Sequence, residues 1–332
     1  MKKIFISLIV LLSGAFIVLL FVFSTDKKNS ADTDYRSAFC EDYKILTPPF
    51  PDSVSFAGEK APLYLFYVRE KFDEQLLRNT FFHSSTIGLI KRSLRWFPVI
   101  EPILKKQNIP VDFKYLVMIE SGLKNVVSPK GATGFWQFLE STALEYDLEV
   151  NKDIDERYYV EKATFAACRY LRDSYEELGS WTLVAATYNA GKKRIKDAIE
   201  RQGTNDFYKL YLNDETSNYI FRILAMKTIF ENPIKYGFYI RKSDMYPVIP
   251  SKTIAVENTV HDLVGFAAQN GISYKLLKLF NPWLRSDKLP DELHKTYFVT
   301  IPDTAFINSE YERRYEDAGS ELFNDTLTVS DI

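Results

Sequence analysis

The sequence contains few residues that bind metal ions. It has two cysteines, Cys40 and Cys168, and three histidines that lie far apart, His83, His261 and His294. Two cysteines are too few for a disulfide-stapled scaffold or a cysteine-based zinc site. No two histidines have the spacing of metal ligands. We therefore expect neither a metal nor another cofactor.

The motifs and charges of nucleotide and nucleic-acid binding are also missing. The sequence has no Walker loop and no GxGxxG. Its 42 lysines and arginines are balanced by 44 aspartates and glutamates, so no global basic field would hold nucleic acid. Aromatic residues, in contrast, make up 15% of the chain. They fill cores or form flat walls for sugar rings, and composition does not distinguish these uses.

The N-terminus is predicted to enter a membrane. Residues 4–23 are uncharged and follow Met1-Lys2-Lys3. As a helix they would span about 30 Å, which is enough for a bilayer core. An uncleaved anchor is favoured over a secretory signal, because a signal's apolar region has about 7–15 residues and no A-x-A site follows Phe23. The two lysines would stay cytoplasmic, with the rest of the chain across the membrane.

The pattern of the remaining chain predicts a mainly α fold with two folded parts. Residues 1–25 contain the anchor or signal, and residues 26–60 are polar and proline-containing, which indicates a linker. From residue 61 to 240 the apolar spacing is mostly three and four, which predicts an all-helical domain. The expected helices are one around residues 87–94 that Pro98 breaks, one from Asp155 to Leu178, and three more over 181–189, 192–202 and 215–231.

Residues 245–303 are predicted to form a small α+β module. The order is a strand over 252–256, helices over 261–270 and 273–279, and a strand over 297–302. The segment 304–332 is acidic and polar, and we expect a solvated tail.

One glutamate occupies a position where the pattern predicts a core residue. Phe113, Leu116, Val117 and Glu120 follow the spacing i, i+3, i+4, i+7 of a buried helical stripe. Burial and the expected helix end at Gly122 both favour a raised pKa for Glu120. Such a carboxyl can protonate a leaving oxygen near neutral pH. The alternative is a side chain that bends out to water at a frayed helix end.

Two further segments carry polar side chains beside glycines. In the first, Gly131 and Gly134 precede Phe135-Trp136-Gln137-Phe138. Gln137 can donate and accept hydrogen bonds, which suits sugar hydroxyls and acetamides, whereas Trp136 alone would be typical of a core. The second, Tyr188-Asn189-Ala190-Gly191, would alone be an ordinary helix end.

Taken together, these motifs resemble the family 1 lytic transglycosylases, and within them the membrane-bound D-type subgroup. The resemblance extends from about Phe97 to Gly237. It implies a goose-lysozyme-like helical domain that cleaves bacterial peptidoglycan. The motifs are, in order, Glu120-Ser121-Gly122, the segment from Ser128 to Phe138, Asp155-Glu156-Arg157, Tyr188-Asn189-Ala190-Gly191, and Glu215-Thr216 with Tyr219. The chain departs from the family at Leu123, Leu139 and Glu140.

The resemblance also implies a reaction and a site. Glu120 would be the general acid and then the base that cleaves the MurNAc–GlcNAc β-1,4 bond without water, leaving 1,6-anhydro-MurNAc ends. Two alternatives stay open: a hydrolytic muramidase of the same fold and a non-catalytic glycan-binding protein. The partners would be peptidoglycan glycan strands and, through residues 4–23, a membrane, with the enzyme anchored at or secreted to the periplasmic side of the envelope. Residues implied to line the sugar cleft are Ser128, Gln137, Tyr188, Asn189 and Tyr219.

The C-terminal module resembles a LysM domain, a fold that binds GlcNAc-containing glycans. The sequence has Glu257-Asn258-Thr259 where such modules usually have Gly-Asp-Thr. The module is therefore expected to be a degenerate LysM, either glycan-binding or purely structural.

Overall fold

The computed structural model describes residues 45–290 and 295–317, with side chains described as far as residue 310. Nearly all of these residues belong to one unit that begins at Pro48. The expected membrane segment, Cys40 and the end of the acidic tail lie outside the described residues. Among the helices that are described, none combines the length and apolar character that a membrane span requires.

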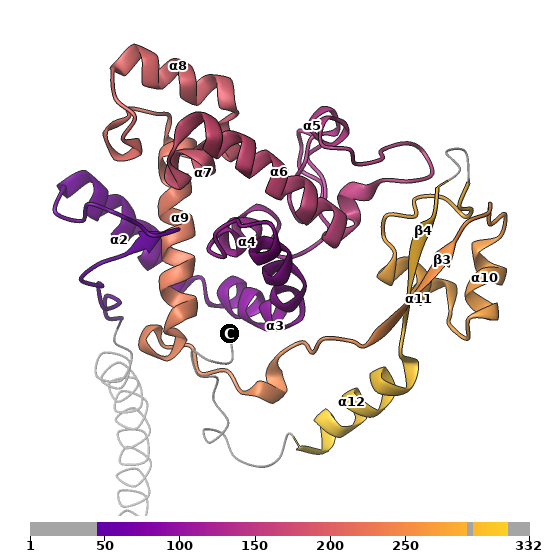
Figure 1. Ribbon diagram of the computed structural model, residues 1–332. Coiled ribbons are helices and arrows are strands. Elements are labelled where there is room, and N and C mark those ends of the chain that lie inside the picture. The colour runs from indigo at the N-terminus through magenta and orange to yellow at the C-terminus, as the bar shows by residue number, and fades with distance from the viewer. Residues whose placement is uncertain (1–44, 291–294, 318–332) are drawn as a thin grey trace, which may run out of the picture. The chain divides into compact units, whose positions relative to one another are not determined.

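Helices make up most of the described chain, which confirms the predicted mainly α fold (Figure 1). Their ends follow local chemistry: Ser180 and Asn213 cap helices α7 and α9, and left-handed glycines end α6 and α8. The α-helices of this part are α2 (Phe66–Phe81), α3 (His83–Lys106), α4 (Phe113–Ser121), α5 (Glu140–Glu145), α6 (Val160–Leu178), α7 (Trp181–Ala190), α8 (Lys192–Gln202) and α9 (Asp214–Glu231). Short 3₁₀ helices are η1 (Glu156–Tyr158), η2 (Phe207–Lys209), η3 (Pro233–Tyr236) and η4 (Lys242–Asp244).

Helix α3 is longer than predicted, and the expected break at Pro98 is wrong. The helix continues through both Pro98 and Pro102. The two prolines are four residues apart, so they share one face, and both are exposed. Water can satisfy the carbonyls that they free on that face. On the opposite face the buried side chains of Phe97, Ile100 and Leu104 hold the helix to the core.

The helix predicted to open at Asp155 begins later. Asp155 caps the 3₁₀ turn η1, and α6 starts only at Val160. The backbone before α6 is occupied by contacts with the C-terminal module: Asp155 N donates to Trp283 O at 2.9 Å. The ring of Tyr159 stacks on Trp283 at 5.6 Å between centroids. These long-range contacts keep the segment extended, and the local sequence pattern does not predict them.

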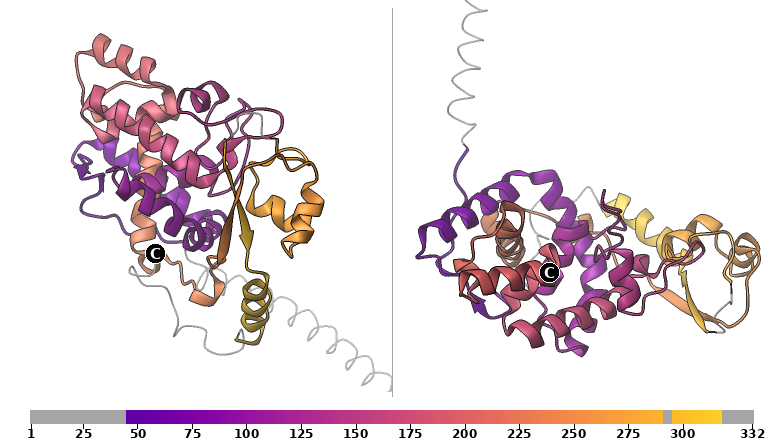
Figure 2. Two further views of the ribbon diagram at one scale, coloured as in Figure 1. Left: turned by 45° about the vertical axis from the view of Figure 1, so that its right-hand side comes forward. Right: turned by 90° about the horizontal axis from the view of Figure 1, so that it is seen from above.

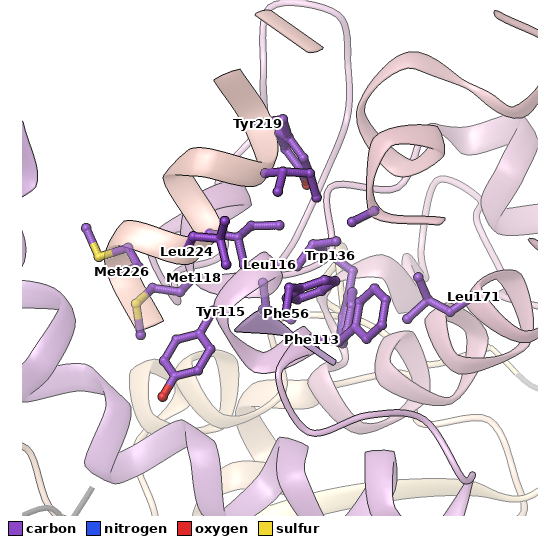
Figure 3. Packing of buried hydrophobic residues seen from close by; sticks show 14 of the residues in the cluster. Phe56, Phe113, Tyr115, Leu116, Met118, Trp136, Leu171, Tyr219, Leu224 and Met226 are labelled. Carbon is purple, nitrogen blue, oxygen red and sulfur yellow. The ribbon is translucent and has the colours of Figure 1, made fainter. Parts of the chain in front are cut away.

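Helix α4 is buried along nearly its whole length. It packs between α3 and α9 (Figure 1), and only its polar positions and last turn reach the surface. Figure 3 shows Leu116 and Met118 of α4 next to Leu224 and Met226 of α9. At ~25 cal/mol per Å² of apolar surface, such burial is the main stabilising contribution to this domain.

Residues 48–60, at the end of the expected linker, are folded into the helical domain. They form a hairpin of β1 (Ser55–Phe56) and β2 (Glu59–Lys60). Phe56 is fully buried, and its ring meets that of Phe113 edge-on at 5.0 Å. The Glu59 carboxylate accepts hydrogen bonds from the Trp181 and Thr182 backbone amides at the start of α7. The hairpin therefore covers α4 and caps α7.

The C-terminal module has the predicted order strand, helix, helix, strand (Figure 2). Its elements are β3 (Ser251–Val256), α10 (Leu263–Gln269), α11 (Tyr274–Phe280) and β4 (Tyr297–Pro302), and the strands pair antiparallel from Ser251↔Pro302 to Val256↔Tyr297. Trp283, Leu277 and Val299 belong to its own hydrophobic core. In the segment expected to be a solvated tail, residues Thr304–Asp317 form helix α12.

Candidate active site

Glu120 lies in the last turn of α4, and that helix end is fixed. The apolar members of the predicted stripe, Phe113, Leu116 and Val117, are fully buried. Gly122 ends the helix in the left-handed conformation, and Arg92 Nε donates to its carbonyl at 2.7 Å. This bond holds the helix terminus, so the side chain of Glu120 stays half-buried at a defined position. The geometry argues against the frayed helix end.

The partner of the Glu120 carboxyl is a hydroxyl. Tyr219, on the second turn of α9 and fully buried, donates its hydroxyl to Glu120 Oε1. Within the described part of the chain, no lysine or arginine forms an ion pair with Glu120. Its second oxygen, Oε2, makes no hydrogen bond to the described residues. It is not among the buried polar atoms that lack a partner, so it is accessible from outside the protein. Oε2 is therefore the oxygen that can carry a proton to a ligand.

The surroundings raise the pKa of Glu120 above that of an ordinary glutamate. Burial is the largest cause, because it disfavours the charged form. The hydrogen bond from Tyr219 and the charge of Arg222 lower the pKa, and the negative charge of Glu215 raises it further. The net direction is upward, as the sequence pattern predicts, so Glu120 keeps its proton to a higher pH than usual.

Tyr188 lies beside this pair, close enough for the charge of Glu120 to act on it. Its hydroxyl donates to the carbonyl of Trp136 at 2.6 Å, and its ring meets that of Tyr170 edge-on at 5.3 Å. Burial, together with the charge of Glu120, raises the pKa of Tyr188 well above its usual value. Tyr188 is therefore neutral near pH 7, and its hydroxyl acts as a hydrogen-bond donor.

The aromatic run 135–138 fills the core and offers no flat wall to sugars. Phe135, Trp136 and Phe138 are buried, and Trp136 Nε1 donates to Thr164 Oγ1 at 2.9 Å. Of the two uses open for Trp136, the structure supports the core. Its backbone carbonyl, which receives the bond from Tyr188, is what connects it to the site.

Gln137 is the one polar residue in the run 135–138, and one of its side-chain atoms remains available to a ligand. Its backbone is left-handed, with φ of 51°. Its side-chain Nε2 donates to the carbonyls of Val126 at 3.0 Å and Gly134 at 2.7 Å. Two carbonyl partners fix which end of the amide is nitrogen, because carbonyls can only accept. Both amide hydrogens are used, so Gln137 presents Oε1 as an acceptor.

Asn189 has the complementary arrangement. Its Oδ1 accepts a hydrogen bond from Thr216 Oγ1 at 3.0 Å, which ties the end of α7 to the first turn of α9. This contact leaves the amide hydrogens of Asn189 available as donors. Thr216 itself is buried, and its backbone amide donates to the capping Asn213.

Ser128 serves the turn that begins the loop. Its hydroxyl oxygen accepts from Ala132 N at 3.0 Å, and its own amide donates to Ala132 O at 2.8 Å. None of the hydrogen bonds or ring contacts among the described residues joins Ser128 to Glu120. Of the six candidate residues, Glu120, Tyr219 and Tyr188 form one cluster, to which Gln137 and Asn189 connect through Trp136 and Thr216.

Arg157 is a supporting residue that sequence reasoning did not assign. It forms a two-pronged ion pair with Asp155, with nitrogen–oxygen distances of 2.9 and 2.7 Å, and both side chains are nearly buried. It also donates to the carbonyls of Gly131 and Phe138 at 3.3 and 3.4 Å. The charges of the 155–157 motif were the available signal, but their partner, the loop 131–138, is distant in sequence.

Gly134 shows how tightly the loop is seated. Its φ is +82°, and a Cβ built on it would lie 1.9 Å from the carbonyl oxygen of Arg157. Only glycine fits this approach. Gly131, with φ of +79°, has open space where a Cβ would project. Arg92 and Thr164 also support the site, and no motif in the sequence pointed to them.

Comparison with known proteins identifies both folded parts. Residues 97–211 match the family model "Transglycosylase SLT domain", and residues 252–305 match "Soluble lytic transglycosylase C-terminal LysM-like domain". Tyr219 lies beyond the first match, so its place in the site rests on the geometry above.

Among curated proteins, the membrane-bound lytic murein transglycosylases D of two Escherichia coli strains, K12 and O6:H1, are each 29% identical over 233 residues. The match covers 67% of this chain and 49% of each relative, so the chain spans about half the length of these curated relatives. A putative tributyltin chloride resistance protein of an Alteromonas species is 28% identical over 98 residues, 29% of this chain and 47% of that protein. The chain thus carries a transglycosylase SLT domain and a LysM-like C-terminal domain, and it is distantly similar to the membrane-bound lytic murein transglycosylases D.

Proposed function

We propose that this chain is a peptidoglycan lytic transglycosylase that cleaves the MurNAc–GlcNAc β-1,4 bond without water and leaves 1,6-anhydro-MurNAc ends. The single observation that carries the proposal is the Glu120 carboxyl: half-buried, with a raised pKa, bonded to the Tyr219 hydroxyl and without an ion-pair partner in the described chain. A structural carboxylate is held by a cation, or by several backbone amides as Glu59 is, whereas a catalytic acid needs its proton.

In the first step, Glu120 would act as general acid. The proton on Oε2 passes to the glycosidic oxygen as the bond to MurNAc C1 breaks, and GlcNAc leaves as an alcohol. The positive charge on the MurNAc ring is carried by an oxocarbenium-like state or by the C2 acetamide, a recognised substrate-assisted route. The Tyr219 hydroxyl stabilises the carboxylate that results, because a hydrogen bond to the charged form favours it.

In the second step, the same carboxylate would act as base. It removes the proton of the C6 hydroxyl of that MurNAc, whose oxygen attacks C1 and closes the 1,6-anhydro ring. Glu120 ends the cycle protonated, as it began. One residue that serves both as acid and as base works best when its pKa lies near the working pH, which matches the upward direction of the shift.

Gln137 and Asn189 would orient the sugar. A sugar acetamide has one N–H donor and one carbonyl acceptor. Gln137 offers an acceptor and Asn189 offers donors, so the two side chains complement an N-acetyl group. Tyr188 would form part of the wall and Ser128 the rim of the same site. Holding the ring in this way contributes to rate through positioning.

The domain division and cellular location belong to the same proposal. Residues 61–240 would form the catalytic domain and residues 245–303 a LysM-like module that meets the glycan or braces the fold. The uncharged segment 4–23, and the word "membrane-bound" in the relatives' name, support an anchor that holds the enzyme on the periplasmic side of the envelope.

A hydrolytic muramidase is the second candidate, and one observation favours it. Glu215, exposed in the first turn of α9, lies near enough to Glu120 for its charge to raise the pKa of that group. A second carboxylate can activate a water. An acidic residue in the first turn is also what a helix N-terminus favours. The identity of the product therefore has to decide.

The test is digestion of purified sacculi by the parent chain, Glu120→Gln and Glu215→Gln, followed by mass spectrometry of the muropeptides. We expect ends one water lighter than reducing ends from the parent and from Glu215→Gln, and none from Glu120→Gln. Reducing ends that disappear in Glu215→Gln would establish the muramidase. If no variant releases fragments and all pellet with sacculi, the chain is a glycan-binding protein.

A further inference from the structure

A hollow lies at the end of α7, between helix α8 and the chain that leads into α9. Its volume is about 500 Å³. Gly191 just before α8 and Arg194 and Arg201 of α8 line one side, and Tyr211 and Asn213 line the other side. Residues 191, 194, 198 and 201 follow helical spacing, so one face of α8 borders the hollow along its whole length. We call it the Arg194–Arg201 pocket.

The charge of the pocket is positive. Lys193 is paired with Asp197 at 2.6 Å, and the two cancel. No carboxylate among the described residues forms an ion pair with Arg194 or Arg201. Both side chains are exposed. Two guanidinium groups with free donors on one helix face are suited to carboxylates, which they bind in two-pronged fashion.

Tyr211 borders the pocket on the side opposite α8, and hydrogen bonds fix its backbone. Tyr211 is 89% exposed. Its amide donates to Gln202 Oε1 at 2.8 Å, and its carbonyl accepts from Gln202 Nε2 at 3.0 Å. Its neighbour Leu210 is buried. The backbone is fixed on α8 while the ring projects into solvent, an arrangement that offers apolar contact area to a ligand.

The pocket is connected to Glu120 through the first turns of α9. Asn213 borders the pocket and caps α9 by accepting from Thr216 N at 2.9 Å. Thr216 then binds Asn189, and one turn later Tyr219 binds Glu120. Residues 213 and 219 are separated by about 9 Å along the helix axis. An extended peptide covers up to ~3.5 Å per residue, so a peptide of three residues attached to a sugar beside Glu120 would be long enough to span a distance of this order.

We propose that the Arg194–Arg201 pocket binds the carboxylates of the peptide that the muramic acid carries on its lactyl group. This inference rests on the proposed function, because it assumes that a muramic acid sits beside Glu120. The two guanidinium groups would bind free carboxylates of the peptide, and the Tyr211 ring would pack against its backbone and apolar groups. The pocket thereby selects glycan that still bears peptides.

The test compares peptide-bearing glycan strands with strands from which an amidase has removed the peptides. The measured quantity is the ratio of the two cleavage rates at low salt, because screening weakens exposed charges. We expect Arg194→Ala/Arg201→Ala to lower this ratio by ~10-fold, the size typical of lost charge-assisted hydrogen bonds. The matched control is Lys196→Ala, which removes a cation from the same helix outside the pocket, where Lys196 pairs with Glu177. It should keep the parent's ratio.

An unchanged ratio in the double arginine variant, or an equal drop in Lys196→Ala, would overturn the proposal. A binding assay separates its failure from failure of the proposed function. Glu120→Gln, alone and with the two arginine changes, is pelleted with peptide-bearing and with peptide-free sacculi. If the parent makes no anhydro ends but the arginine changes still abolish a preference for peptide-bearing material, the pocket stands and the transglycosylase does not. If anhydro ends form and no preference exists, the pocket alone is wrong.

Discussion

Glu120 and three acidic residues in the segment before α6 are all buried or half-buried, but their surroundings are opposite. Glu149, Asp155 and Glu156, in the segment before α6, each have a cationic partner: Lys295, Arg157 and Lys162. Glu120 has only the Tyr219 hydroxyl. Burying a charge is costly unless it is paired. The paired acids can therefore be explained by structure alone, whereas Glu120 cannot.

A chain of contacts nevertheless connects the paired acids to Glu120. Asp155 orients Arg157, and Arg157 holds the carbonyls of Gly131 and Phe138 at the two ends of the loop. That loop carries Gln137 and supplies the Trp136 carbonyl to Tyr188, beside Glu120. The paired charges hold in place the polar groups that surround the unpaired one.

The largest effect is expected from breaking a paired acid. Asp155→Asn leaves the guanidinium of Arg157 nearly buried without its counter-charge. Loss of one partner of a buried pair costs about 3 kcal/mol or more in the free energy of unfolding. Denaturant unfolding followed by circular dichroism measures this. The control is Asp147→Asn, whose carboxylate is 82% exposed in its pair with Arg169 and should cost less than ~1 kcal/mol. Equal losses would contradict the role given to Asp155.

Removing the unpaired acid should change stability in the other direction. The folded-state pKa of Glu120 is raised above its unfolded value, so its ionisation opposes folding at neutral pH. Glu120→Gln is therefore expected to stabilise the chain by about 1 kcal/mol at pH 7. The gain should vanish as the pH falls below the unfolded value of ~4.3, where both forms are neutral. Destabilisation at pH 7 would show that the carboxylate is structural.

The smallest effect is expected on the pH profile of cleavage. The Tyr219 bond lowers the pKa of Glu120 and the Glu215 charge raises it. Tyr219→Phe should therefore move the alkaline limb of the rate profile to higher pH, and Glu215→Gln should move it to lower pH, because this limb reports loss of the protonated acid. Tyr146→Phe, whose hydroxyl binds Asp173, is the control and should move neither limb. Shifts in the same direction for both variants would refute the opposite effects of Tyr219 and Glu215 on the pKa of Glu120.

Much of the fold was predictable because it depends on neighbouring residues. The period of the apolar positions predicted α4, and Gly122 predicted its end, so the half-buried position of Glu120 followed from ten consecutive residues, 113–122. The caps at Ser180 and Ser273 likewise begin helices where the pattern indicates. The strand–helix–helix–strand order of the C-terminal module was predictable for the same reason.

The rest depends on residues that are distant in sequence. Pro98 is tolerated because the other face of α3 is buried, and Phe56 is folded because it meets Phe113. The role of Arg157 follows from the loop that it binds. The role of Tyr219 follows from its bond to the carboxyl of Glu120, 99 residues earlier. Local patterns contain no information on such pairs, and the resemblance supplied only some of them.

The proposed chemistry requires that the surroundings of the Glu120 carboxyl favour its protonated form. The most direct measurement is the titration of its side-chain carboxyl by carbon-13 NMR, identified as the resonance absent from Glu120→Gln. We expect a pKa clearly above the ~4.3 of an ordinary glutamate. A pKa at or below that value would show that Glu120 is ionised at neutral pH, and the proposed acid would not exist.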